Sequence, residues 1–162
     1  MEEGITMEAV KKSTREQTRT PNLRWPRYYF SIATTVAEHS KCNRDKVGSI
    51  ATKDRRIIAT GYNGLVSGAL DDACECKETG ETLPEVAHSE INLLGQLAQS
   101  TETTKGIQVW ITRKPCLPCA VAILAAGVHE LHCLDKGSGD GIPLLTKHAL
   151  VKIYSEEEIF PT

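Results

Sequence analysis

The stretch from residue 106 to residue 134 constrains the fold most, because it changes its hydrophobic periodicity twice. "GIQVWIT" alternates as a β-strand does, "CLPCAVAILAAG" forms an apolar helical run that ends at Gly127, and "VHELHCL" alternates again. A strand, a helix and a second strand in this order favour a crossover connection between parallel strands. The sequence therefore predicts a sheet that contains parallel strands, with helices packed on it.

The rest of the chain adds elements to this core. "WPRYYFSIATTVAEHS" has apolar residues at helical spacing, and "KVGSIAT" and "RIIATGYN" form a hairpin around the polar turn "KDR". Residues 61–85 form a long loop, and the next helix starts near His88. "GIPLLTKHALV" predicts a last helix and "VKIYS" an edge strand. We expect one α/β domain over residues 23–162, a three-layer α/β/α sandwich with a mixed five-stranded sheet, after a flexible tail at 1–22.

Charge and composition exclude several classes of protein. The net charge is −2 and the pI about 6.2, which argues against binding to a nucleic acid polymer and favours a small substrate. No apolar run is long enough for a membrane span. The start, "MEEGITMEAVKKSTREQ", lacks the apolar stretch of a signal peptide, so we expect a cytoplasmic protein whose cysteines are reduced.

Two of the six cysteines, Cys116 and Cys119, stand three positions apart at the start of the apolar helix. Both thiols share one helix face, and the helix N-terminus favours the thiolate form that zinc needs. Taken alone, C-x-x-C fits a redox dithiol, half of a zinc ribbon, or coincidence. Cys133 lies in an alternating strand pattern and is interpreted as a small core residue.

A second motif, "AHSEIN", resolves that ambiguity. On their own, His88 and Glu90 would be read as an ordinary hydrogen-bonded histidine and a solvated acid. Together with the downstream P-C-x-x-C they form the H-x-E and P-C-x-x-C signature of zinc nucleobase deaminases. One His and two Cys leave the fourth zinc position open for water, whose pKa zinc lowers to about 7. Glu90 would then carry protons from that water to the base and to the departing ammonia.

The chain resembles the deoxycytidylate (dCMP) deaminase family of the cytidine deaminase superfamily. The resemblance covers about residues 25–153 and includes "SKCNRDKVGSI" and "RIIATGYNGLVSG" besides the zinc motifs. It implies a cytidine deaminase-like fold, catalytic Zn²⁺ on His88, Cys116 and Cys119, Glu90 as the proton shuttle, and Asn63 against the substrate sugar. Ser89 stands where the family has Ala and is placed next to the base.

The same resemblance implies further sites. Arg113 and Lys114 replace the usual residues before the first zinc cysteine, where they either contact the nucleotide phosphate or are merely solvated. A second, structural zinc would take its ligands from His39, Cys42, Cys74 and Cys76; in the alternative, Cys42 packs and the loop cysteines stay free. The family forms homo-oligomers, hexamers or dimers. Its dCTP and dTTP effectors, which would carry Mg²⁺, bind near the loop that here comprises Gly61, Tyr62, Asn63 and Gly64.

Three functions remain open at this point. The first is hydrolysis of dCMP to dUMP and ammonia, for the supply of pyrimidine deoxynucleotides. The second is the same chemistry on dCTP, cytidine or a base in RNA. The third is a zinc-stabilised binding module without catalysis, which would need a fourth protein ligand near Cys116 that the sequence does not offer.

Overall fold

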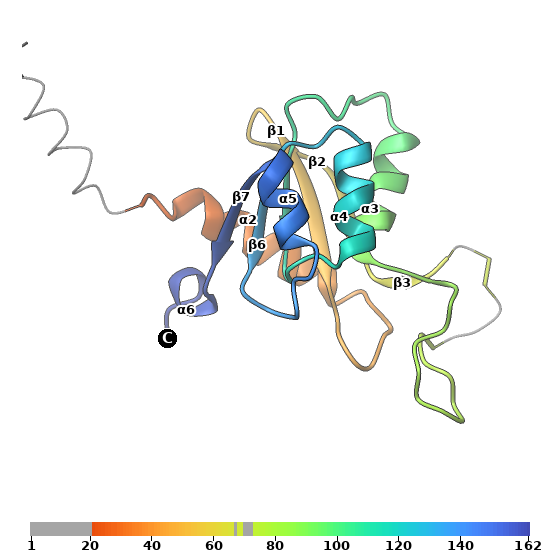
Figure 1. The fold of residues 1–162 in the computed structure, drawn as a ribbon. Coiled ribbons are helices and arrows are strands. Elements are labelled where there is room, and N and C mark those ends of the chain that lie inside the picture. Colours follow the sequence, from red (N-terminus) through yellow and green to blue (C-terminus); the bar gives the residue numbers. More distant parts are fainter. Residues whose placement is uncertain (1–20, 67, 70–72) are drawn as a thin grey trace, which may run out of the picture.

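The fold is a mixed sheet of five strands with helices on both faces (Figure 1). This computed structural model describes residues 21–66, 68–69 and 73–162. The strand order is β2-β1-β5-β6-β7. The strands are β1 (Gly48–Lys53), β2 (Arg56–Tyr62), β5 (Gln108–Ile111), β6 (Glu130–Leu134) and β7 (Leu150–Tyr154). The predicted three-layer α/β/α sandwich with a mixed five-stranded sheet is thereby confirmed.

Strand direction changes once across the sheet. β1 pairs antiparallel with both β2 and β5, whereas β5, β6 and β7 are mutually parallel. The β1–β2 turn uses Asp54 (φ 50°) and Arg55 (φ 64°), both in the left-handed region that two-residue hairpin turns require. The parallel strands are joined through α4 (Leu117–Ala125) and α5 (Ile142–His148), as the alternating sequence pattern predicts.

Alternate residues of the central strands pack into two separate hydrophobic cores, one on each face of the sheet. Val109 and Ile111 of β5 pack in one cluster with residues of α3 (Ser89–Ala98), α4 and α5. Trp110, between them, faces the opposite cluster, which contains Phe30 of α2 (Arg24–Ala37). This alternation fixes the layers, with α3, α4 and α5 on one face and α2 on the other (Figure 1).

Two glycines let helices approach the hairpin more closely than any other residue would allow. A Cβ on Gly48 would lie 2.0 Å from the backbone oxygen of Ala33 in α2. A Cβ on Gly61 would lie 2.4 Å from the backbone oxygen of Ser89 and 2.6 Å from the backbone nitrogen of Leu93, both in α3. Gly61, the first glycine of the GYNG stretch, therefore has a packing role, because it lets the start of α3 pack directly on β2.

The predicted loop at 61–85 and the predicted end of the chain both contain structure that the pattern did not reveal. β3 (Gly64–Leu65) pairs with β4 (Val86–Ala87), and a short helix, α6 (Glu156–Ile159), follows β7. A capping box between Ser155 and Glu158 starts α6, so the acids of that segment are helical.

The predicted tail at 1–22 falls almost wholly outside the described residues and stays a prediction. Within the part of the chain that the structure describes, no helix combines the length and apolar character that crossing a membrane requires.

Candidate active site

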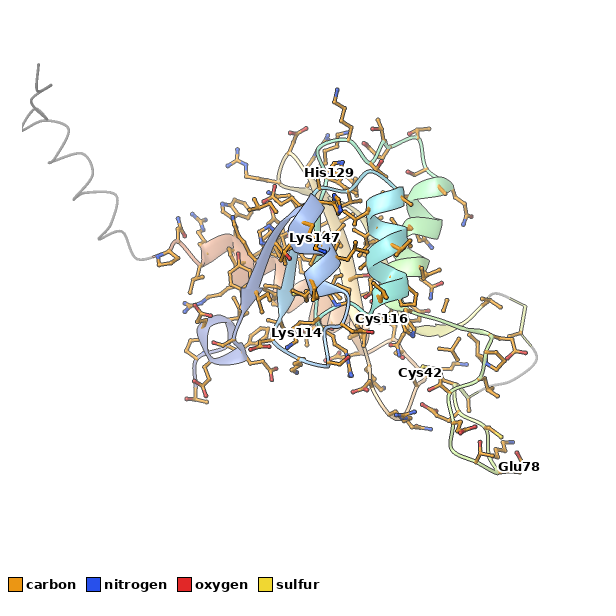
Figure 2. The ribbon with its side chains drawn as sticks, viewed as in Figure 1. Cys42, Glu78, Lys114, Cys116, His129 and Lys147 are labelled. Atoms are coloured by element: carbon orange, nitrogen blue, oxygen red, sulfur yellow. A yellow bond between two sulfur atoms is a disulfide. The ribbon has the colours of Figure 1, made fainter. Side chains whose placement is uncertain are left out.

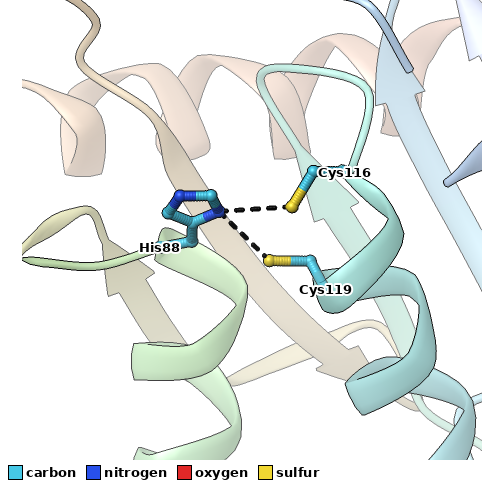
Figure 3. A group of neighbouring side chains, drawn as sticks. All are labelled: His88, Cys116 and Cys119. Atoms are coloured by element: carbon cyan, nitrogen blue, oxygen red, sulfur yellow. Dashed lines mark hydrogen bonds between the residues drawn. The ribbon is translucent and has the colours of Figure 1, made fainter. Parts of the chain in front are cut away.

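Three potential metal ligands meet where two helices begin. His88 is the N-cap residue of α3, Cys116 is the N-cap residue of α4, and Cys119 lies in the first turn of α4. The Nδ1 atom of His88 is 3.4 Å from the Sγ of Cys116 and 3.3 Å from the Sγ of Cys119 (Figure 3). Among the described residues this is the one group of three or more such side chains close enough to share an ion.

The spacing of these atoms fits a tetrahedral zinc ion. Zn–N bonds of about 2.0–2.1 Å and Zn–S bonds of about 2.3 Å place the nitrogen and a sulfur about 3.5 Å apart at a tetrahedral angle. The two nitrogen–sulfur distances are within about 0.2 Å of that value. Three protein ligands leave one coordination position for a water molecule or a substrate, which distinguishes a catalytic zinc site from a structural one.

The pKa of the Cys119 thiol indicates what a thiolate ligand at this position would need. Burial raises the pKa of the Cys119 thiol above its usual range, and the neighbouring Glu90 carboxylate and Cys116 raise it further. A thiolate ligand at this position is therefore stable only beside a positive charge, which a divalent metal supplies.

Glu90 lies in the first turn of α3, next to the three ligands but not in their group. Its side chain is only 5% exposed, and its Oε2 accepts a hydrogen bond of 3.0 Å from the Ser89 hydroxyl. A second contact fixes the same turn, since the Ser49 hydroxyl on β1 lies 3.0 Å from the backbone oxygen of Ser89. The carboxylate is thus held beside the metal position and remains available to move protons.

A cavity of about 230 Å³ opens over this centre. His88, Ser89, Glu90 and Cys116 line its metal end. Figure 2 shows Cys116 and Lys114 at one end of the domain, with His129 at the opposite end. The cavity therefore lies at the carboxyl end of the parallel strands, where open α/β sheets bind their ligands.

The predicted substrate-binding residues also reach the cavity. Asn63, Arg113 and Lys114 all line it. The Asn63 amide, however, donates to the backbone oxygen of Asp45 at 2.7 Å, and its Oδ1 accepts from the backbone nitrogen of Val47 at 2.8 Å. In this structure Asn63 therefore braces the neighbouring turn, and a sugar contact would have to use its remaining donor and acceptor capacity.

The two cations before Cys116 each have an acidic partner. Arg113 Nη1 is 2.7 Å from Asp45 Oδ2, and Lys114 Nζ is 2.6 Å from Asp135 Oδ1. Both side chains are more than half buried, so the description of two freely solvated charges does not apply.

The predicted effector loop is largely structural. Gly61 lies directly against the backbone of α3, as described above. The backbone oxygen of Tyr62 accepts a 2.7 Å hydrogen bond from the Asn92 side chain, while the Tyr62 ring is 42% exposed. Gly64 pairs with Ala87 in the β3–β4 ladder.

The structure does not form the predicted second zinc site, and here the prediction needs correction. Cys42 and Cys74 form a disulfide, so neither sulfur is a thiolate that could bind a metal. Cys76 lies 3.0 Å from the Oε2 of Glu78, at the far side of the loop (Figure 2), and His39 packs near the Tyr62 ring. The expectation that all cysteines are reduced is contradicted by the same disulfide.

Several cavity residues escaped the sequence analysis. Arg44 stands inside the quoted "SKCNRDKVGSI" stretch, which offered a signal that was not followed. Ser138 belongs to the glycine-rich "KGSGDG" segment, a recognisable pattern for a loop beside a ligand. Asp45 stands in the same stretch as Arg44, whereas Glu75 carried no signal, because only the tertiary fold brings its segment to the cavity.

Comparisons with known proteins show similarity to deaminases. A family model described as MafB19-like deaminase matches residues 23–157. The chain is 34% identical over 119 residues to the deoxycytidylate deaminase of Mycobacterium phage D29, which covers 66% of this chain and 91% of that protein. It is 31% identical over 115 residues to the deoxycytidylate deaminase of Homo sapiens, over 67% of this chain and 64% of that protein.

A solved structure is similar in fold as well. The dCMP deaminase of cyanophage S-TIM5, determined with dCMP and dUMP, superposes with a TM-score of 0.77 at 33% identity. The match covers 84% of this chain and 99% of that one. The similarity therefore extends over nearly the whole phage protein, whereas the human relative is longer than the matched region.

Proposed function

The chain belongs to the cytidine and deoxycytidylate deaminase family, and we propose from this premise that it hydrolyses dCMP to dUMP and ammonia. The observation that carries the proposal is one cavity that contains a three-ligand metal position and a buried carboxylate, Glu90. The phage relatives, which the chain matches over 91% and 99% of their lengths, are named for this substrate.

His88, Cys116 and Cys119 would hold the zinc ion. When bound there, zinc lowers the pKa of water to about 7 and so supplies a nucleophile at neutral pH. In the reaction a C–O bond forms at C4 of cytosine and the C4–N bond to the amino group breaks. Glu90 accepts a proton from the attacking water, delivers it to ring N3, and passes a second proton to the departing ammonia.

Ser89 and Asn63 have supporting roles in this proposal. The Ser89 hydroxyl orients the Glu90 carboxylate through their 3.0 Å hydrogen bond. Asn63 braces the turn at Asp45 and Val47 that forms part of the cavity wall. Arg113 and Lys114, both at this wall, supply positive charge for the substrate phosphate.

Glu90→Gln tests the proton transfer without removing the metal ligands. We expect ammonia release from dCMP to fall by about 10²- to 10⁴-fold, because an amide cannot accept the proton. Zinc content measured by atomic absorption should stay at that of the wild type, because Glu90 is outside the ligand group. Glu38→Gln, at the exposed C-cap of α2, is the matched control and should leave the rate unchanged. Full activity in Glu90→Gln would refute the mechanism.

The substrate is tested with the same assay on dCMP, dCTP, deoxycytidine and RNA. The proposal expects dCMP to give the highest kcat/KM. A preference for dCTP or deoxycytidine would keep the chemistry and change the substrate. If no nucleotide yields ammonia and chelation unfolds the protein, the binding-module alternative would stand instead.

Further family properties are proposals for this chain. A homo-oligomer is supported by exposed apolar side chains on the outer faces of α3 and α4, at Ile91, Leu117 and Val121. A dNTP effector with Mg²⁺ follows from the family resemblance alone, and a cytoplasmic location is expected from the polar start of the sequence.

A further inference from the structure

A disulfide and several hydrogen bonds join two segments of the cavity wall that are far apart in the sequence. Residues 42–45 precede β1, and residues 74–75 lie in the long loop before β4. The disulfide between Cys42 and Cys74 joins them, and Glu75 adds a second connection. Its Oε1 accepts from the backbone nitrogens of Asn43 at 2.9 Å and Arg44 at 3.1 Å, and its Oε2 accepts from the Asn43 side chain at 3.3 Å.

The turn that Glu75 holds carries charged residues of the cavity. Arg44 and Asp45 both line it, as does Glu75 itself. Asp45 in turn holds Arg113 through the 2.7 Å ion pair, and its backbone oxygen accepts from Asn63. Glu75 and Asn63 therefore fix the backbone of this turn from two sides, and the orientations of Arg44 and Arg113 depend on it.

Arg44 is the cation of this wall whose charge is least compensated. Arg113 and Lys114 each have a carboxylate within 2.7 Å, whereas Arg44 forms no ion pair with any residue the structure describes. A guanidinium group presents donors in a planar fork that matches a phosphate group. Arg113 also keeps donors beyond the one nearest Asp45, because its guanidinium has five N–H groups.

The metal end is anchored by other contacts. There, Gly61 of β2 touches the start of α3, and the Ser49 hydroxyl lies within hydrogen-bonding distance of Ser89. Disturbing the turn at 43–45 should therefore leave the reacting centre in place and disturb only the part of the cavity that carries the cations.

We propose that Glu75 is a positioning residue for substrate selection, which sets Arg44 and Arg113 to bind the anionic end of the nucleotide through the turn at 43–45. The inference rests on the proposed function, since it presupposes a phosphate-bearing substrate. Without the carboxylate, two backbone N–H groups lose their acceptor, and the turn gains freedom that phosphate binding must remove.

The test compares kcat/KM for dCMP and for deoxycytidine, which lacks the phosphate. Glu75→Ala should lower kcat/KM for dCMP by about tenfold or more through a higher KM, which corresponds to losing a hydrogen bond to a charged group. For deoxycytidine the change should stay below about twofold, because the metal end does not depend on Glu75. Glu75→Gln, whose amide oxygen can still accept from the backbone, should recover part of the loss. Glu78→Gln, in the same loop but outside the cavity lining, should match the wild type.

A double-mutant cycle separates positioning from a general structural role. In an Arg44→Ala background, the further loss on dCMP caused by Glu75→Ala should shrink to less than about threefold, because of the two positioned cations only Arg113 is then left. Equal losses for dCMP and deoxycytidine, or equal losses with and without Arg44, would overturn the proposal, and so would an unchanged dCMP rate in Glu75→Ala. A wild-type protein that deaminates deoxycytidine but not dCMP would instead overturn the proposed function and this inference with it.

Discussion

The buried imidazole of His132 should make the protein sensitive to mild acid. Its side chain is 3% exposed and stacks on the Trp110 ring with centroids 3.7 Å apart. Nε2 lies 3.1 Å from Glu130 Oε1 and Nδ1 lies 3.0 Å from the Tyr154 hydroxyl. A carboxylate can only accept, so Nε2 carries the proton and Nδ1 accepts from Tyr154. Burial lowers the pKa of the ring and so keeps it neutral at pH 7, and protonation of Nδ1 would force the Tyr154 hydroxyl to turn from donor to acceptor.

The size of the effect follows from the pKa of His132. Burial lowers that pKa from 6.5 to about 4, although Glu130 acts in the opposite direction. Each unit of difference between the folded and unfolded pKa is worth about 1.4 kcal/mol, so the whole difference is worth roughly 3 kcal/mol. The folded pKa is the lower one. Stability is therefore complete above about pH 6.5 and is lost as the pH falls toward 4, where the unfolded chain binds a proton that the folded chain does not.

Urea unfolding at several pH values measures this contribution. Wild type and His132→Gln, which cannot titrate, should be compared between pH 7.5 and pH 5 with chelator present throughout, so that loss of metal is common to both. The free energy of unfolding of the wild type should fall by about 2 kcal/mol more than that of the variant over this range. His129→Gln, at an exposed histidine, should follow the wild type. If wild type and His132→Gln lose stability in parallel, the argument from the buried neutral ring is refuted.

Two further predictions concern packing and assembly. In a denaturation experiment, Gly48→Ala should lower the free energy of unfolding by about 1–3 kcal/mol, because the new Cβ would meet the backbone of α2. Gly95→Ala is the control, because its Cβ would meet nothing within 4 Å; it should be neutral or stabilising by about 0.5–1 kcal/mol. Val121→Lys, on the exposed face of α4 where Val121 is 52% exposed, should lower the mass of the assembly in analytical ultracentrifugation, and an unchanged mass would exclude that face as a subunit contact.

The fold could be predicted because its periodicities are local. Each strand of the parallel half is short and each helix between them has an apolar face, so the order of elements alone led to the sandwich. The three candidate metal ligands could be predicted for a related reason. Cys116 and Cys119 share one helical turn, and the signature that links them to His88 names all three residues.

The cavity wall could not be predicted in the same way. Glu75 and Arg44 are more than thirty positions apart in irregular segments, where no periodicity relates one residue to another. The disulfide was missed for a different reason, since reduced cysteines were expected from the polar start of the chain. That expectation also led to the incorrect second zinc site, because free thiols at Cys42 and Cys74 were counted as ligands.

The direct contact of Gly61 with the backbone of α3 has a consequence for how such a protein can change over time. The reacting centre is held largely by close packing of main-chain atoms, together with the Ser49 hydroxyl, whereas the wall around the rest of the cavity is held by the side chains of Glu75, Asn63 and Asp45. Substrate specificity could therefore change during evolution through mutations in the segments of the cavity wall, while the reacting centre stays the same.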